Sequence, residues 1–125
     1  MKIGIIGTGG VGGYFGGKLA YTGYDVTFIS RGEQLKALQE NGLTVKSILG
    51  DFKIDRINAT DRLSELCYVD LILICVKAWQ LKEIAQKLNE VVNKNTIVIP
   101  LQNGVSAVDE LKEHLNESNI AGGLC

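Results

Sequence analysis

Residues 7–12 read Gly7-Thr8-Gly9-Gly10-Val11-Gly12, and this stretch decides how the chain is interpreted. It has the spacing G-x-G-x-x-G, follows the β-like run Lys2–Ile6, and opens a segment that can form a helix over residues 10–22. In that context the first glycine allows a tight turn, the second lets backbone approach a pyrophosphate, and the third lets helix and strand pack closely. The helix N–H groups and dipole would then face an anion. The motif therefore predicts a dinucleotide phosphate site.

Glycine is unusually frequent in this part of the chain, with six glycines between residues 9 and 17. Each one costs a helix interior about 1 kcal/mol relative to alanine. Close packing on a sheet would explain some of them without any ligand, whereas a bound phosphate would better explain the first three. The position of the motif between a strand and a helix is what favours a dinucleotide over packing alone.

The rest of the chain alternates strand-like and helix-like segments. Residues 71–76 are apolar without alternation, as in a strand covered on both faces. Residues 81–92 carry an apolar stripe at three- and four-residue spacing, as in a helix on a sheet. Repeated β-then-α units predict a Rossmann-type, doubly wound α/β fold with a mainly parallel sheet, a central first strand and helices on both faces. The expected strands are Lys2–Ile6, Asp25–Ile29 and residues 70–76, 96–100 and 120–124, and a further helix covers residues 105–115.

Local signals mark where several elements begin and end. Gly23 suits the left-handed position after the first helix. Ser30 and Glu33 have the S-x-x-E spacing of a capping box, which predicts that Ser30 caps the second helix. The remaining expected elements are that second helix up to about Gly42, a hairpin of residues 43–48 and 52–57, and a short helix near residues 61–66.

Composition restricts the class of protein. The chain has 125 residues, 46% of them apolar and 22% charged, which fits one globular domain. A net charge of -1 provides no broad basic field, so no nucleic-acid partner is expected. The longest apolar run, residues 71–76, is too short to span a membrane, and no signal-peptide pattern is present, so a cytoplasmic protein is expected. Cys67, Cys75 and Cys125 lack metal-binding spacing and are interpreted as buried thiols, and His114 as an exposed residue without chemistry.

Arg31 indicates which dinucleotide is bound. Domains that prefer NAD place an acidic residue at the end of the second strand, about 20 residues after the glycine turn. This chain has Ser30 and Arg31 there, and a guanidinium can hold a ribose 2′-phosphate through two charge-assisted hydrogen bonds. The pattern therefore favours NADP(H). A solvated arginine is the alternative, and nearby Glu33 could be its partner or a ribose ligand.

Two further motifs carry a resemblance to a known family. They are Val76-Lys77-Ala78-Trp79-Gln80, after one strand, and Pro100-Leu101-Gln102-Asn103-Gly104, after the next. Together with the glycine turn they make the chain similar, over essentially its whole length, to the ketopantoate reductase family. The resemblance implies reduction of ketopantoate to pantoate with NADPH, a step toward pantothenate and coenzyme A. It also implies that Lys77 and Asn103 reach the nicotinamide side of the cofactor and that Asn103 touches the substrate, a small 2-keto acid.

The residues themselves favour the same location for Lys77 and Asn103. Both follow the carboxyl ends of strands that flank the expected crevice, where ligands bind in open α/β sheets. Lys77 could stabilise negative charge on a ketone oxygen, and Asn103 could donate a hydrogen bond to it. The alternatives are a solvated lysine at a helix start and an asparagine that serves the turn before Gly104.

The resemblance also implies what the chain lacks. In the family the proton-donating lysine and a cofactor-contacting glutamate lie in a helical C-terminal domain that has no counterpart here. We therefore expect residues 1–125 to be the NADP-binding N-terminal part of a longer protein, to bind cofactor without turnover, and to self-associate through the apolar surface that would meet the missing domain. The alternatives are the cofactor domain of another 2-keto acid or hydroxyacid dehydrogenase, and a non-catalytic nucleotide-sensing module.

Overall fold

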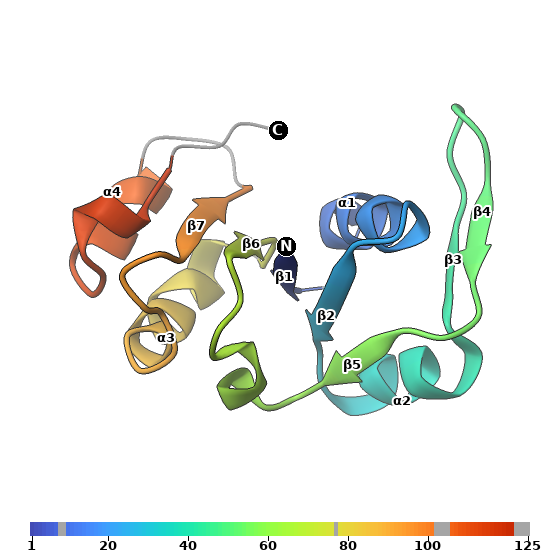
Figure 1. Ribbon diagram of the computed structural model, residues 1–125, viewed down its shortest axis with the longest axis horizontal. Coiled ribbons are helices and arrows are strands. Elements are labelled where there is room, and N and C mark those ends of the chain that lie inside the picture. The colour runs from blue at the N-terminus through green and yellow to red at the C-terminus, as the bar shows by residue number, and fades with distance from the viewer. Residues whose placement is uncertain (8–9, 77, 102–105, 122–125) are drawn as a thin grey trace.

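The computed structural model describes residues 1–7, 10–76, 78–101 and 106–121, and its centre is a five-stranded parallel sheet (Figure 1). The strands are β1 (Lys2–Ile6), β2 (Asp25–Ile29), β5 (Asn58–Thr60), β6 (Leu71–Ile74) and β7 (Ile97–Pro100), in the order β5-β2-β1-β6-β7. The chain runs outward from β1 to β2 and β5, then returns to the other side of β1 for β6 and β7. The strand order therefore reverses between β1 and β6, which confirms a doubly wound sheet with a central first strand.

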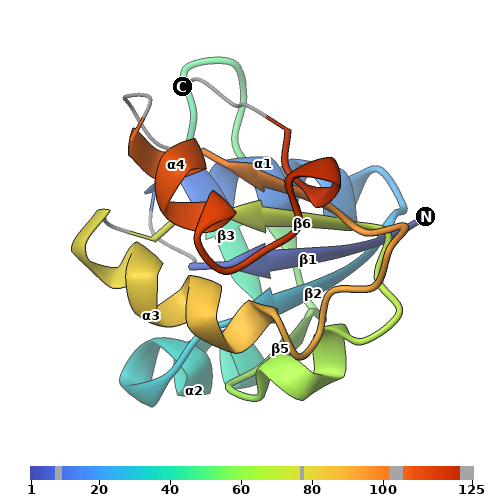
Figure 2. The ribbon, with the colours of Figure 1, turned by 90° about the vertical axis from the view of Figure 1, so that its left-hand side faces the viewer.

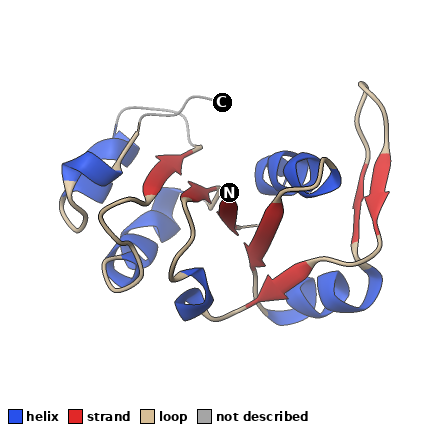
Figure 3. Ribbon diagram, in the orientation of Figure 1, coloured by secondary structure: helices blue, strands red, loops and turns tan. Residues whose placement is uncertain are grey.

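Helices cover both faces of this sheet, as the apolar pattern of residues 71–76 predicts (Figure 3). The helices are α1 (Gly10–Tyr21), α2 (Gly32–Asn41), α3 (Ala78–Leu88) and α4 (Ser106–Lys112). On one face Leu81, Ala85 and Leu88 of α3 pack in one cluster with sheet residues such as Ile72 and Val98. On the opposite face α1 lies over β1 and β2. Its Gly16 lies against the side chains of Ile5 and Phe28, which belong to a second cluster.

A small antiparallel hairpin stands apart from the sheet and packs beside α1 (Figure 1). Its strands are β3 (Leu43–Val45) and β4 (Phe52–Ile54), joined by a turn in which Gly50 has φ 125°. The hairpin prediction is confirmed, but both arms are shorter than expected. Residues 58–60 instead form β5, an edge strand of the main sheet that the sequence did not predict. Asn58-Ala59-Thr60 is short and has no large apolar residue, so it lacks the pattern by which strands are usually recognised.

Some local predictions are wrong. Ser30 does not cap α2: Arg31 is the N-cap residue and makes no side-chain hydrogen bond to the helix. Ser30 is buried and extends the sheet, because its backbone N–H donates to the carbonyl oxygen of Thr60 at 3.0 Å. His114 is half-buried rather than exposed, and its Nε2 atom has no hydrogen-bond partner among the described residues. It lies two residues after the end of α4, where the chain turns back toward the sheet.

Other expectations are met in part. The short segment after β5 is a 3₁₀ helix, η1 (Leu63–Leu66), and α4 is followed by another, η2 (Glu117–Asn119). Ile120 forms a parallel bridge with Val98, where the strand over residues 120–124 was expected to begin; residues 122–125 lie outside the described part of the chain. Cys67 and Cys75 are half-buried and form no disulfide with a described residue, and Cys125 is not among the described residues. None of the described helices has the length and apolar character needed to cross a bilayer.

Candidate cofactor-binding site

The candidate site lies at the carboxyl-terminal edge of the sheet, opposite the edge where the N-terminus enters β1 (Figure 2). Parallel hydrogen bonding continues past the strand ends. Gly7, Cys75 and Leu101 each donate a backbone N–H to the last residue of a neighbouring strand, at 3.1, 2.8 and 2.8 Å. The segments that follow β1, β6 and β7 therefore all leave the sheet along one edge, across the point where the strand order reverses. This is where open α/β sheets bind ligands.

Gly7 and Gly12 build a tight turn above β1. Gly7 has φ 91°, in the left-handed region that favours glycine, and a β-carbon there would lie 2.9 Å from the carbonyl oxygen of Cys75. A β-carbon on Gly12 would lie 1.9 Å from the carbonyl oxygen of Gly7 and 3.0 Å from Cβ of Cys75. The first turn of α1 is thus seated directly on the end of β1. This close approach is the geometry that a pyrophosphate at the helix N-terminus requires.

The other residues of the motif are described less completely. Gly10 and Val11 form the first turn of α1, where their backbone N–H groups belong to the helix start. Thr8 and Gly9 lie outside the described residues. Gly7 and Gly12 are the motif glycines whose surroundings are described, and a β-carbon on either would collide with backbone atoms.

Gly16 and Gly17 have a different explanation. A β-carbon on Gly16 would lie 2.6 Å from the ring of Phe28, within the core under α1. A β-carbon on Gly17 would lie 2.8 Å from the Leu43 side chain, at the hairpin. Packing therefore accounts for the later glycines of α1, while Gly12 contacts backbone of the turn itself. The explanation of the first glycines by a bound phosphate stays a prediction.

Arg31 stands at the end of β2, on the same edge as the glycine turn. The Arg31 backbone is extended, with φ -152°, and the residue is exposed to solvent. Among the described residues it forms no ion pair with Glu33, which is also exposed. The dipole of α2 disfavours a cation at this end of the helix, so a bound anion would offset an unfavourable position.

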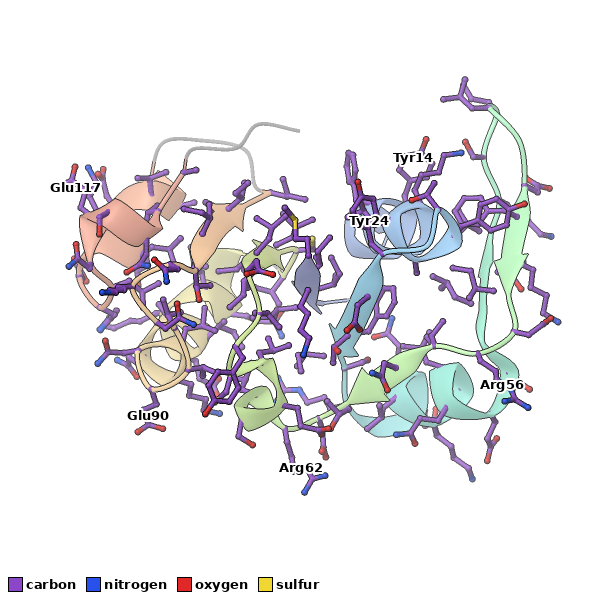
Figure 4. All side chains as sticks on the ribbon, in the orientation of Figure 1. Tyr14, Tyr24, Arg56, Arg62, Glu90 and Glu117 are labelled. Atoms are coloured by element: carbon purple, nitrogen blue, oxygen red, sulfur yellow. The ribbon has the colours of Figure 1, made fainter. Side chains whose placement is uncertain are left out.

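Thr60 and Arg62 were not identified from the sequence as neighbours of the candidate site, because β5 was not predicted. Thr60 lies beside Ser30, and its hydroxyl hydrogen-bonds Glu65 and accepts the backbone N–H of Arg62. The Nε atom of Arg62 lies 3.4 Å from Glu65, and Figure 4 shows the Arg62 side chain at the outside of the molecule. Of these two arginines, Arg31 is therefore the one without a carboxylate partner among the described residues.

Lys77 and Asn103 lie outside the described residues, so the structure does not place their side chains. The residues next to them are placed. Val76 directly follows Cys75, and Leu101 donates to the carbonyl oxygen of Ile74, so both segments start from the edge that holds Gly7. The expectation that these two segments share one edge with the glycine turn is confirmed for the residues that flank them.

A parallel sheet of this order, with a glycine turn seated on its central strand at the point of reversal, defines a nicotinamide-dinucleotide-binding domain of the Rossmann class. The family model described as ketopantoate reductase PanE/ApbA matches residues 3–125. The chain belongs to the ketopantoate reductase family, whose reaction class is oxidoreductase.

The similar proteins are longer than this chain. A 2-dehydropantoate 2-reductase from Nostoc sp. is 36% identical over 124 residues, which are 99% of this chain and 39% of that protein. An uncharacterized oxidoreductase, YkpB, from Bacillus subtilis is 32% identical over 127 residues, 100% of this chain and 41% of that protein. The chain thus spans about two fifths of the curated relatives it matches.

Solved structures agree with this assignment. A PanE/ApbA family ketopantoate reductase from Ralstonia eutropha superposes with a TM-score of 0.86 at 32% identity, over 99% of this chain and 40% of that chain. D-mandelate dehydrogenase, in a ternary structure with NADH and anilino(oxo)acetate, superposes with a TM-score of 0.88 at 28% identity, again over 99% and 40% of the two chains.

Proposed function

We propose that this chain is the NADP(H)-binding domain of a 2-dehydropantoate 2-reductase, which reduces ketopantoate to pantoate on the way to pantothenate and coenzyme A. The observation that carries the proposal is the joint presence of the family match over residues 3–125 and the backbone contact between Gly7 and Gly12 at the strand reversal. We place the reaction in the cytoplasm, as the sequence predicts.

The cofactor would lie across the carboxyl edge of the sheet. The backbone of residues 7–12 would hold the pyrophosphate against the N-terminus of α1. When bound, the reduced nicotinamide supplies a hydride to the substrate ketone. Lys77 would stabilise negative charge on the ketone oxygen, and Asn103 would donate a hydrogen bond to that oxygen and orient the substrate. Both residues follow strands that end at this edge, which supports the assignment.

NADP(H) is proposed over NAD(H) because of Arg31. The end of β2 offers an exposed arginine in place of an acidic residue, and no carboxylate of the described chain neutralises it. A 2′-phosphate carries about -1.5 to -2 charges if it titrates like other phosphomonoesters. A planar guanidinium matches such a group with two hydrogen bonds.

The remaining catalytic groups would come from outside these 125 residues. We propose that residues 1–125 form the cofactor domain, and that the proton donor and further substrate ligands belong to a helical domain of the complete enzyme. The chain alone would then bind cofactor without turnover. Apolar residues of β7 and the residue after it support the proposal of such a contact surface, because Ile97 is 39% exposed and Ile99 and Leu101 are only half-buried. Self-association through this face would appear as dimers in sedimentation, and a monomer at high concentration would contradict it.

A second candidate is the cofactor domain of a different 2-keto acid reductase that uses NADH. The superposition on D-mandelate dehydrogenase is the observation that favours it, because that protein was solved with NADH and with anilino(oxo)acetate, a 2-oxo acid analogue. The two candidates differ in the cofactor they prefer and in the side chain of the keto acid they accept.

One chimera separates the two candidates. In it, this chain replaces the matching 39% of the Nostoc relative, so that a complete protein is assayed. The proposal expects oxidation of NADPH that depends on ketopantoate, and none by the isolated chain. Because the helical domain of the chimera comes from Nostoc, the cofactor is the discriminating readout, and preferred turnover with NADH would support the second candidate. An isolated chain that binds neither dinucleotide in calorimetry would contradict both.

A further inference from the structure

Three described glycines adopt left-handed backbone conformations although nothing lies near them. Gly23 has φ 103°, Gly32 has φ 65° and Gly50 has φ 125°, and a β-carbon on any of them would meet no atom within 4 Å. Packing does not require glycine at these positions, so the backbone conformation does. At Gly23 and Gly50 the reason is ordinary: Gly23 follows the end of α1, and Gly50 turns the hairpin.

Gly32 has no such ordinary reason. It opens α2, at the end of the helix where a left-handed residue is not needed. The residue before it, Arg31, is extended with φ -152° and ψ 165°, and the residues after it are helical. The chain therefore changes direction sharply between the last residue of the β2 edge and the first turn of α2. Arg31 is left at the carboxyl edge of the sheet while the helix leaves it.

We propose that Gly32 is a positioning residue that aims Arg31 at the 2′-phosphate of NADP(H). The inference rests on the proposed function, because it assumes that Arg31 contacts that phosphate. A substituted residue at Gly32 would either keep a strained left-handed backbone or relax toward the right-handed region. Relaxation would rotate the peptide that joins Arg31 to α2. A guanidinium that binds a phosphate through two parallel hydrogen bonds tolerates little rotation, whereas a ribose 2′-hydroxyl makes no such demand.

The test measures binding of NADPH and NADH to the chain by calorimetry, together with the melting temperature of each variant. Gly32→Ala should weaken NADPH binding by roughly 5- to 10-fold, about the loss of one weak charge-assisted contact, and leave NADH within about twofold. Gly32→Asn should restore most of the NADPH affinity, because asparagine tolerates the left-handed region. Gly23→Ala is the matched control, an equally open left-handed glycine that should lower the melting temperature without changing the ratio of the two affinities.

Arg31→Ala separates failure of this inference from failure of the proposed function. If Arg31→Ala lowers NADPH affinity selectively and Gly32→Ala does not, the positioning role is wrong and the cofactor assignment stands. If Arg31→Ala affects both dinucleotides equally, the cofactor assignment is wrong and the role of Gly32 falls with it. If Gly32→Ala does not fold, Gly32→Ser carries the same measurement. If no substitution at Gly32 folds while Gly23→Ala does, Gly32 is a structural residue and the inference is overturned.

Discussion

The central sheet has an edge where its parallel strands begin and an edge where they end, and different groups make the contacts at these two edges. At the amino-terminal edge, side chains close the structure. Asn119 is buried and donates Nδ2 hydrogen bonds to the carbonyl oxygens of Asn93 and Thr96 at 2.9 and 2.7 Å. Thr96 donates its hydroxyl to the carbonyl oxygen of Val69 at 3.0 Å, and Asp70 accepts the backbone N–H of Lys2 at 2.9 Å. These polar groups at the amino-terminal edge therefore form hydrogen bonds with other groups of the protein.

At the carboxyl-terminal edge, the close contacts are made by glycine backbone and not by polar side chains. Gly7 and Gly12 bring two backbone segments together without a side chain between them, and Arg31 has no ion-pair partner among the described residues. We infer from this difference that the amino-terminal edge contributes mainly to stability and the carboxyl-terminal edge mainly to cofactor binding. Substitutions at the amino-terminal edge should lower the free energy of unfolding and leave cofactor affinity unchanged, and substitutions at the carboxyl-terminal edge should change cofactor affinity.

The largest effect is expected for Gly12→Ala. The new β-carbon would lie 1.9 Å from a backbone oxygen, so the turn itself must move. Because both dinucleotides share the pyrophosphate, NADPH and NADH affinities should fall together by about 1,000-fold or more, which is about 4 kcal/mol. Gly17→Ala is the control on the same helix, since its β-carbon meets only side-chain atoms that can shift. Calorimetry should find its affinities within about threefold of wild type. Wild-type binding by the Gly12 variant would contradict the proposed phosphate site.

Asn119→Ala should have the next largest effect, and it should act on stability alone. It removes one buried and one partly buried hydrogen bond and leaves the carbonyl oxygen of Thr96 without the Asn119 donor. The unsatisfied carbonyl should cost about 1–3 kcal/mol and the lost bond to Asn93 about 0.5–1.5 kcal/mol, so the total should be about 1.5–4.5 kcal/mol, measured by urea denaturation. Asn119→Asp keeps the shape but supplies no donor, so it should be at least as unstable. A fall in cofactor affinity at a temperature where both variants are folded would break the separation between the two edges.

Arg31→Ala should have the opposite signature, with a change in specificity and little change in stability. Hydrogen bonds to charged groups contribute about 1.5–3 kcal/mol, so NADPH binding should weaken by roughly 10- to 100-fold. NADH affinity should change little, because NADH carries only a hydroxyl at that position. The preference for NADPH should also shrink as salt is raised, since the residue is exposed. Equal losses for both dinucleotides in calorimetric titrations would mean that Arg31 only supports the start of α2.

Sequence reasoning was most successful where one residue type has one physical purpose. The turn at Gly7 and Gly12, the central β1 and the apolar β6 were predictable because glycine spacing and unbroken apolar runs have few alternatives. Sequence reasoning failed where tertiary contacts determine the hydrogen-bond partners of a residue. Ser30 has the spacing of a helix cap, but its backbone pairs with β5, a strand whose sequence carries no apolar signal. The closed amino-terminal edge was also missed, because Asn119 finds its partners far away in the sequence, at residues 93 and 96.

The smallest effect should come from Asp70→Ala, which sharpens the comparison within the amino-terminal edge. Asp70 and Asn119 both bond backbone groups there, but the Asp70 bond to Lys2 is exposed to water whereas Asn119 is buried. Water can replace the lost acceptor for the Lys2 N–H, so the cost should stay near the net contribution of one hydrogen bond, about 0.5–1 kcal/mol. Asp70→Asn keeps a side-chain oxygen acceptor and should lie close to wild type in urea denaturation. If Asp70→Ala instead costs as much as Asn119→Ala, burial does not set the strength of these bonds, and the amino-terminal edge depends on the position of each bond between the strands.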